Sequence, residues 1–202
     1  MNLGIIIKSR NFKEGGGYTI TYDILDNLIA NPKLINHKLF FVIINDYSKE
    51  IENKIKKKKI NYFKYYENDN ILKLTNFFFS KYSFINNFFN LLGFNKIENY
   101  LRENNVEIIW PISSEMRYPF SLPYIFTVWD VQHKAIPEYP EVGSFFIKTY
   151  RDQIFKSNFI RAKYILFGNK SSYRIASKFY KLSKKKIFFN CHPTPSWALT
   201  KK

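Results

Sequence analysis

The sequence predicts an α/β fold, a Rossmann-like and mostly parallel sheet of about seven strands flanked by helices. Two observations lead to this prediction. Short runs of apolar, often β-branched residues, such as residues 3–7 and 39–44, are typical of strands buried on both faces. Segments with helical periodicity separate these runs, and a regular alternation of strand and helix indicates βαβ units in a parallel sheet.

The first elements follow from apolar runs and from residues that break them. After the strand at residues 3–7 comes a polar loop that ends in three glycines, Gly15, Gly16 and Gly17. A helix is predicted from Tyr18, where apolar residues take up helical spacing, and it stops before Pro32 because a residue that precedes proline disfavours the helical conformation. The second strand at 39–44 is followed by a charged helix (48–59) and a third strand (60–65).

The remaining elements alternate in the same way. Residues 77–94 carry a broad stripe of apolar, mostly aromatic side chains at helical spacing, and Gly93 is the predicted stop signal. Two interpretations of this stripe stay open, packing against the sheet or contact with an anionic membrane. Further helices are predicted at 95–102, 144–161 and 169–181, and further strands at 106–112, 123–128, 164–167 and 187–189.

The net charge of +16, from 32 Lys and Arg against 16 Asp and Glu, raises the question of nucleic-acid binding. Arginine is scarce among these cations, whereas nucleic-acid surfaces favour its bidentate guanidinium. Lys, Asn, Ile, Phe and Tyr together make up over half of the chain, and all five have A/T-rich codons. Codon usage therefore accounts for much of the lysine, and we predict no nucleic-acid partner.

Several other classes are excluded by the composition. A single cysteine, Cys191, leaves no disulfide framework and no cysteine-based metal cluster, and we predict neither a metal nor a cofactor. The first residues do not read as a signal peptide, and no run of apolar residues is long enough to span a bilayer. We therefore expect a cytoplasmic protein.

Polar residues follow the predicted strands where each strand ends. Trp129 and Asp130, with His133 just beyond, follow the strand at 123–128, and Asn169 follows the strand at 164–167. Ligands bind outside the carboxyl ends of strands in open parallel sheets, so we expect a ligand cleft here. A carboxylate near an imidazole can orient a sugar hydroxyl or tune the histidine, although such a pair also occurs as a simple loop anchor.

The three glycines permit two interpretations. Backbone amides at a helix N-terminus, unobstructed by Cβ atoms, suit a phosphate or another anion. A flexible turn between strand and helix explains Gly15, Gly16 and Gly17 equally well. Their spacing matches neither a dinucleotide-binding fingerprint nor a P-loop, which disfavours both of those enzyme classes.

Three segments resemble the acceptor-side domain of GT-B glycosyltransferases, family 4, that build polysaccharides. They are the first strand, glycines and helix (3–28), the string Thr-Val-Trp-Asp-Val-Gln-His at 127–133 with Pro-Glu-Tyr-Pro-Glu-Val at 137–142, and the helix–strand–helix from Arg151 to Ile187. The second segment is the most specific of the three. Residues 46–105 match only as a pattern of elements.

The resemblance implies a glycosyltransferase of the hexosyltransferase type, acting in polysaccharide or lipopolysaccharide assembly with retention of configuration. Its donor would be a nucleotide sugar and its acceptor a saccharide or a lipid-linked saccharide. It implies that Gly15, Gly16 and Gly17 approach the donor phosphates and the acceptor, and that Trp129, Asp130 and His133 face the reacting sugar, with Asn169 as a weaker binding candidate.

Asp130 and His133 are accordingly the predicted catalytic residues. Many relatives have histidine where this chain has Trp129, so His133 either takes over a sugar contact or only holds the loop.

The predicted domain organisation is an acceptor-side domain at residues 1–190 and the start of an interdomain connection, or a truncated tail, at 191–202. The family's donor-binding domain would follow residue 190, so we expect half of an enzyme that is inactive alone. Association with the inner face of an anionic membrane is an additional expectation. Two alternatives to the glycosyltransferase remain. The first is a non-catalytic Rossmann-like partner subunit, and the second, less favoured, is a basic nucleic-acid-binding protein.

Overall fold

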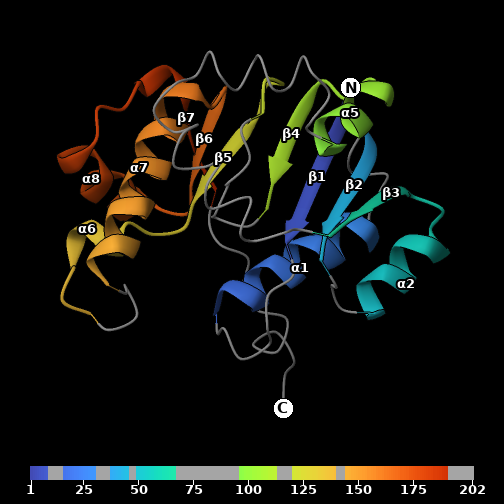
Figure 1. Ribbon diagram of the computed structural model, residues 1–202, viewed down its shortest axis with the longest axis horizontal. Helices are drawn as coiled ribbons and strands as arrows, with labels where there is room; N and C mark the ends of the chain where they lie inside the picture. The colour runs from blue at the N-terminus through green and yellow to red at the C-terminus, as the bar shows by residue number, and fades with distance from the viewer. Residues whose placement is uncertain are drawn as a thin grey trace. The chain divides into compact units, whose positions relative to one another are not determined.

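The computed structural model describes residues 1–8, 16–30, 37–45, 49–66, 96–112, 120–139 and 144–190 of the 202-residue chain (Figure 1). These residues fall into two compact units, and each unit contains its own parallel sheet.

The first unit is built on four parallel strands in the order β3-β2-β1-β4. The pairing is continuous across the centre of the sheet, where Ile5 is the register partner of Phe41 on one side and of Trp110 on the other. The strands are β1 (Asn2–Lys8), β2 (Lys38–Ile44), β3 (Asn61–Tyr65) and β4 (Ile108–Pro111), and the helices are α1 (Gly16–Ala30), α2 (Lys49–Lys57) and α5 (Lys96–Glu103).

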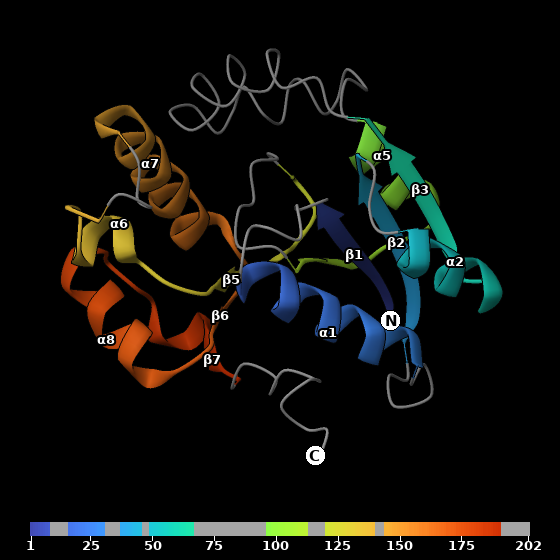
Figure 2. The same ribbon diagram turned by 90° about the horizontal axis from the view of Figure 1, so that it is seen from below.

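The two central strands explain the apolar runs in the sequence. The middle residues of β1 and nearly all of β2 are buried, because helices cover both faces of a parallel sheet. Figure 2 shows α1 and α2 on one face and α5 on the other, as right-handed crossovers require when the strand order reverses after β3. The predicted buried strands at 3–7 and 39–44 are confirmed.

The second unit contains three parallel strands in the order β5-β6-β7. Its core is aromatic, since the ring of Phe126 on β5 contacts the rings of Phe155 and Phe159 edge-on at centroid distances of 5.3 and 5.5 Å. The strands are β5 (Ile125–Val128), β6 (Tyr164–Phe167) and β7 (Ile187–Phe189); the helices are α6 (Gln132–Ala135), α7 (Phe145–Arg161) and α8 (Lys170–Phe179), with a 3₁₀ turn η4 (Lys184–Lys186).

The α/β class, the parallel pairing and the total of about seven strands are as predicted, whereas the expectation of one continuous sheet is corrected. The described strands form a sheet of four and a sheet of three. An apolar run indicates that a strand is buried, whereas its hydrogen-bonding partner depends on how the chain packs. The predicted helix at 77–94 and the tail at 191–202 lie outside the described residues.

Two segments expected as loops are helical. Gly16 and Gly17 are the first residues of α1, where amides have no intrahelical partner and the weak helix propensity of glycine costs least. His133 lies in α6, a single turn where a loop was expected. Within the described ranges, no helix is long and apolar enough to cross a membrane.

At Gly4, β1 lies close to the side chains of α5 and of the segment that follows it. A Cβ atom on this residue would lie 2.9 Å from Cδ2 of Leu101 and 3.1 Å from Cγ1 of Val106. Leu101 is fully buried, so its side chain has little room to move away. Glycine is therefore needed at this position for the packing of α5 against β1.

The substitution Gly4→Ala should destabilise the protein by about 1–3 kcal/mol through overpacking. Urea unfolding measures this change. In a Leu101→Ala background the cost of Gly4→Ala should shrink, because the shortened side chain removes the nearest clash. An equal cost in both backgrounds would contradict the proposed contact.

Candidate functional site

The candidate site is built on the carboxyl ends of β5 and β6. Val128 at the end of β5 is the register partner of Phe167 at the end of β6. Parallel strands in register end at the same edge, so Trp129 and Asp130 lie at the same edge of the sheet as Asn169. The structure thus brings three of the predicted site residues to one edge.

Asp130 lies just before the short helix that follows β5. Its Oδ1 accepts a hydrogen bond from the backbone amide of Gln132 at 3.1 Å, and the residue is half-buried. One such bond leaves most acceptor positions of the carboxylate unused by that contact. Trp129, immediately before it, is also half-buried. A half-buried carboxylate with spare acceptor capacity is suited to hold a hydroxyl group.

Asn169 caps the helix that follows β6. Its side-chain Oδ1 accepts a hydrogen bond from the amide of Ser172 at 2.7 Å, and its backbone is extended as an N-cap requires. This contact explains why asparagine stands between the strand and α8. Its predicted role in ligand binding stays a prediction.

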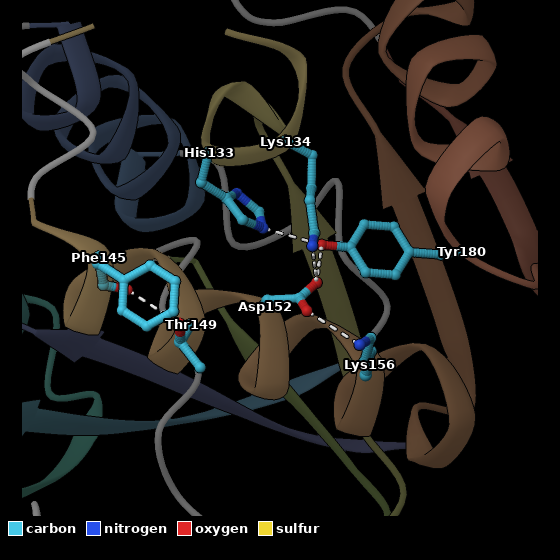
Figure 3. A network of polar contacts seen from close by, with 7 residues as sticks. All are labelled: His133, Lys134, Phe145, Thr149, Asp152, Lys156 and Tyr180. Atoms are coloured by element: carbon cyan, nitrogen blue, oxygen red, sulfur yellow. Dashed lines mark hydrogen bonds and ion pairs between the residues drawn. The ribbon is translucent and has the colours of Figure 1, made fainter. Parts of the chain in front are cut away.

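His133 belongs to a buried polar network (Figure 3). Its side chain is only 3% exposed, and Nε2 lies 2.8 Å from the Tyr180 hydroxyl. That hydroxyl donates to Oδ1 of Asp152 at 2.9 Å. Because an ionised carboxylate only accepts, the hydroxyl hydrogen goes to Asp152 and the imidazole Nε2–H must donate to Tyr180.

Asp152 forms ion pairs with two further side chains. The Lys134 ammonium lies 3.1 Å from its Oδ1 and the Lys156 ammonium lies 2.9 Å from its Oδ2. Burial by itself would raise the pKa of the Asp152 carboxyl, but hydrogen bonds from Lys156, Lys134 and Tyr180 outweigh it and hold that pKa below its ordinary value. Asp152 is therefore the ionised centre of the network.

The protonation states of the other two members follow from burial. Desolvation, with the charge of Arg151 second, lowers the pKa of His133 to about 4. Desolvation and the hydrogen bond to Asp152 raise the pKa of Tyr180 far above its usual value. At neutral pH the imidazole is neutral and the phenol is protonated. Nδ1 of His133 has no hydrogen-bond partner.

These contacts fit the second of the two roles considered for His133, that of holding the loop after β5. Its imidazole is buried against Phe155 and Tyr180 instead of lying on the open edge where it was expected. A direct sugar contact by His133 stays a prediction.

The predicted phosphate-binding glycines belong to the first unit. Gly16 and Gly17 lie in the first turn of α1, where backbone N–H groups lack intrahelical partners and suit an anion. Gly15 lies outside the described residues. The glycines and the Asp130 edge are thus carried by different units.

Sequence reasoning missed Tyr180, Asp152 and Lys134. Tyr180 lies 47 positions after His133 and 28 positions after Asp152, and no local spacing signals such a contact. Among the described residues, no group of three or more His, Cys, Asp or Glu side chains is arranged to hold a metal ion.

Comparison with known proteins gives a likeness of fold. No protein-family model matches the sequence, and no curated protein matches it significantly. Among solved structures, HepE from Anabaena in complex with UDP matches with a TM-score of 0.51 at 6% identity, over 96% of this chain and 44% of that chain. The apo form of the lipopolysaccharide outer core galactosyltransferase WaaB matches with a TM-score of 0.49 at 14% identity, over 93% and 44% respectively.

At such low identity, the match to HepE shows the fold alone. The chain has the Rossmann-like α/β fold of a GT-B glycosyltransferase domain, which confirms the predicted resemblance at the level of architecture. The chain spans 44% of the length of each of these two structures.

The depressed pKa of His133 predicts a loss of stability in mild acid. Above about pH 6.5 histidine is neutral in both states. Between pH 6.5 and about 4 the unfolded chain binds a proton that the folded chain does not, so the free energy of unfolding falls by roughly 1–3 kcal/mol as the pH falls. Urea unfolding of the wild type and of His133→Gln across this range measures the effect.

The His133→Gln variant should show a shallower decline, because it has no proton to take up at this position. His37 is exposed, and His37→Gln is the control for replacing a histidine outside the network. Equal slopes for wild type and His133→Gln would rule out this account.

Tyr180→Phe should lower the free energy of unfolding by about 1–3 kcal/mol, because it leaves the buried Nε2–H of His133 without an acceptor. Tyr173→Phe is the matched control, since that ring packs on Phe167 and Phe189 and it should change stability by less than about 0.5 kcal/mol. Thermal or urea unfolding compares the two. Similar losses would argue against the network.

Proposed function

We propose that this chain is the acceptor-side domain of a GT-B glycosyltransferase that transfers a sugar from a nucleotide-sugar donor to a saccharide or lipid-linked acceptor. The observation that carries the proposal is the half-buried Asp130, which lies at the carboxyl edge of β5 and β6 in a chain with this fold. Ligands of open parallel sheets bind at that edge. The match to HepE, a protein solved with UDP, supports a nucleotide-sugar donor.

In this proposal Asp130 accepts a hydrogen bond from a sugar hydroxyl and orients it, and Trp129 lines the same position. His133 positions the segment after β5 through its hydrogen bond to Tyr180. Of the two predicted catalytic residues, Asp130 is therefore the stronger candidate for contact with the sugar. Amides of Gly16 and Gly17 approach the donor phosphates. The reaction is transfer with retention, in which fixed dipoles stabilise the developing charge on the sugar and the leaving diphosphate.

Transfer would need a second domain that grips the donor. The chain spans 44% of HepE, and this share supports the proposal that the 202 residues alone turn over little or no nucleotide sugar. We further propose that the protein acts in the cytoplasm in polysaccharide or lipopolysaccharide assembly. Its net charge of +16 supports attraction to an anionic membrane that carries lipid-linked acceptors.

The test is release of nucleotide from a panel of UDP-, GDP- and ADP-sugars in the presence of lipid-linked saccharides. It compares the 202-residue chain alone with the complete protein from the native gene. Release should occur with the complete protein and not with the chain alone. Failure of the complete protein with every donor would overturn the proposed sugar transfer. Turnover by the chain alone at a full rate would overturn the proposed need for a second domain.

Within the active protein, Asp130→Asn should reduce kcat/KM at least about tenfold, which corresponds to about 1.4 kcal/mol of lost transition-state stabilisation. Glu103→Gln makes the same charge change on an exposed residue of α5 and should leave kcat/KM unchanged. Equal rates for the two variants would remove Asp130 from the site.

A further inference from the structure

A pocket lies at the edge of the β5–β7 sheet opposite to Asp130. It has a volume of about 390 Å³, and its lining includes Tyr124, Lys163 and Lys186, which directly precede β5, β6 and β7. The strands are parallel, so their amino ends share one edge, whereas Asp130 and Asn169 follow the carboxyl ends. A strand of four residues spans roughly 13 Å, which separates this pocket from the proposed transfer site.

Among the described residues that line the pocket, the charged side chains are three cations, Arg161, Lys163 and Lys186. Across the described residues, none of the three forms an ion pair with a carboxylate. Lysine is common on this chain, so exposed lysines by themselves carry little information. The informative feature is that two of these cations are held in place beside a concave surface.

Backbone carbonyls fix these two cations. The Arg161 Nη2 donates to the carbonyl of Phe120 at 2.7 Å, and the Lys186 Nζ donates to the carbonyl of Ile160 at 2.8 Å. The second bond satisfies a carbonyl in the last turn of α7, which accounts for one donor of Lys186. A guanidinium has five N–H donors and an ammonium three, so four and two remain after these bonds. Side chains already ordered lose less entropy when they bind.

Most of the other described lining residues are apolar, with Ser121 as the polar exception. Leu122 and Pro123 line the pocket together with the edge of the buried Tyr124, whose hydroxyl is occupied by a hydrogen bond to Asn158 at 2.9 Å. The volume lies within the range of small-molecule sites and exceeds what a bare phosphate needs. Such a wall suits a ligand with an anionic end and an organic body.

We propose that this pocket binds a phosphate ester, whose phosphate pairs with Arg161 and Lys186 and whose organic part lies on Leu122 and Pro123. Arginine matches the bidentate geometry of a phosphate, and the ammonium adds a charge-assisted hydrogen bond. The ester is either a soluble sugar phosphate or the phosphate of a lipid headgroup, since both offer the same chemistry. This inference does not depend on the proposed sugar transfer.

The test is titration of the 202-residue chain with glucose 1-phosphate, monitored by ¹H–¹⁵N NMR, with inorganic phosphate and glucose as reference ligands. We expect saturable shifts of the amide signals of residues 120–122, 124 and 161–163, and tighter binding of the ester than of either reference. Arg161→Gln and Lys186→Gln should each weaken binding at least about tenfold. Arg161→Lys, which keeps the charge but loses the planar fork, should give an intermediate affinity.

Arg174→Gln is the matched control, because it removes an exposed arginine of α8 that does not line the pocket. It should bind the ester like the wild type, and the thermal midpoints of all variants show whether they are folded. If vesicles of phosphatidylglycerol compete with glucose 1-phosphate and vesicles of phosphatidylcholine do not, the ligand is a lipid headgroup. If neither kind of vesicle competes, the ligand is a soluble phosphate ester. Equal affinities of Arg161→Gln and Arg174→Gln, or no saturable binding of the ester and the vesicles, would overturn the proposal.

Discussion

Backbone hydrogen bonds join β5 to β6 from Ile125 opposite Tyr164 to Val128 opposite Phe167. Both strands have four residues and run in parallel, so this one ladder determines which residues share an edge. The carboxyl edge holds Asp130 and the cap of α8, and the amino edge holds the cation-lined pocket. A slip of one residue in the pairing would turn every side chain of a strand to the other face of the sheet. Burial of the aromatic side chains in the core therefore fixes the register, and the register fixes which residues lie at each edge.

The polar network around the partly buried Asp152 fixes the segment that follows β5. A helix of one turn, such as α6, has little stability of its own and depends on tertiary contacts. His133 reaches Asp152 through the Tyr180 hydroxyl, and the neighbouring Lys134 reaches it directly. Two consecutive residues of α6 are thereby tied to α7 and to the end of α8. The position of Asp130 thus depends on groups that need not contact any ligand.

Two groups of cations in the second unit differ in their bonding partners. Lys134 and Lys156 pair with the partly buried carboxylate of Asp152, so their charge stabilises the fold. Arg161 and Lys186 donate to backbone carbonyls and have no carboxylate partner among the described residues, and the proposed phosphate ester would use their charge. Net charge alone distinguishes neither case, because it records neither the partner nor the burial of a cation.

Local patterns in the sequence determined the α/β class, the parallel strands and the places where they end. The strands at 164–167 and 187–189 have the predicted bounds, and Asp130 follows β5 as expected, because apolar runs and their polar ends are local properties. Only the tertiary structure decided the division into sheets of four and three strands, the single turn that carries His133, and its hydrogen bond to Tyr180. Periodicity shows that a side chain is buried, but which distant group it meets depends on the packing of the whole unit.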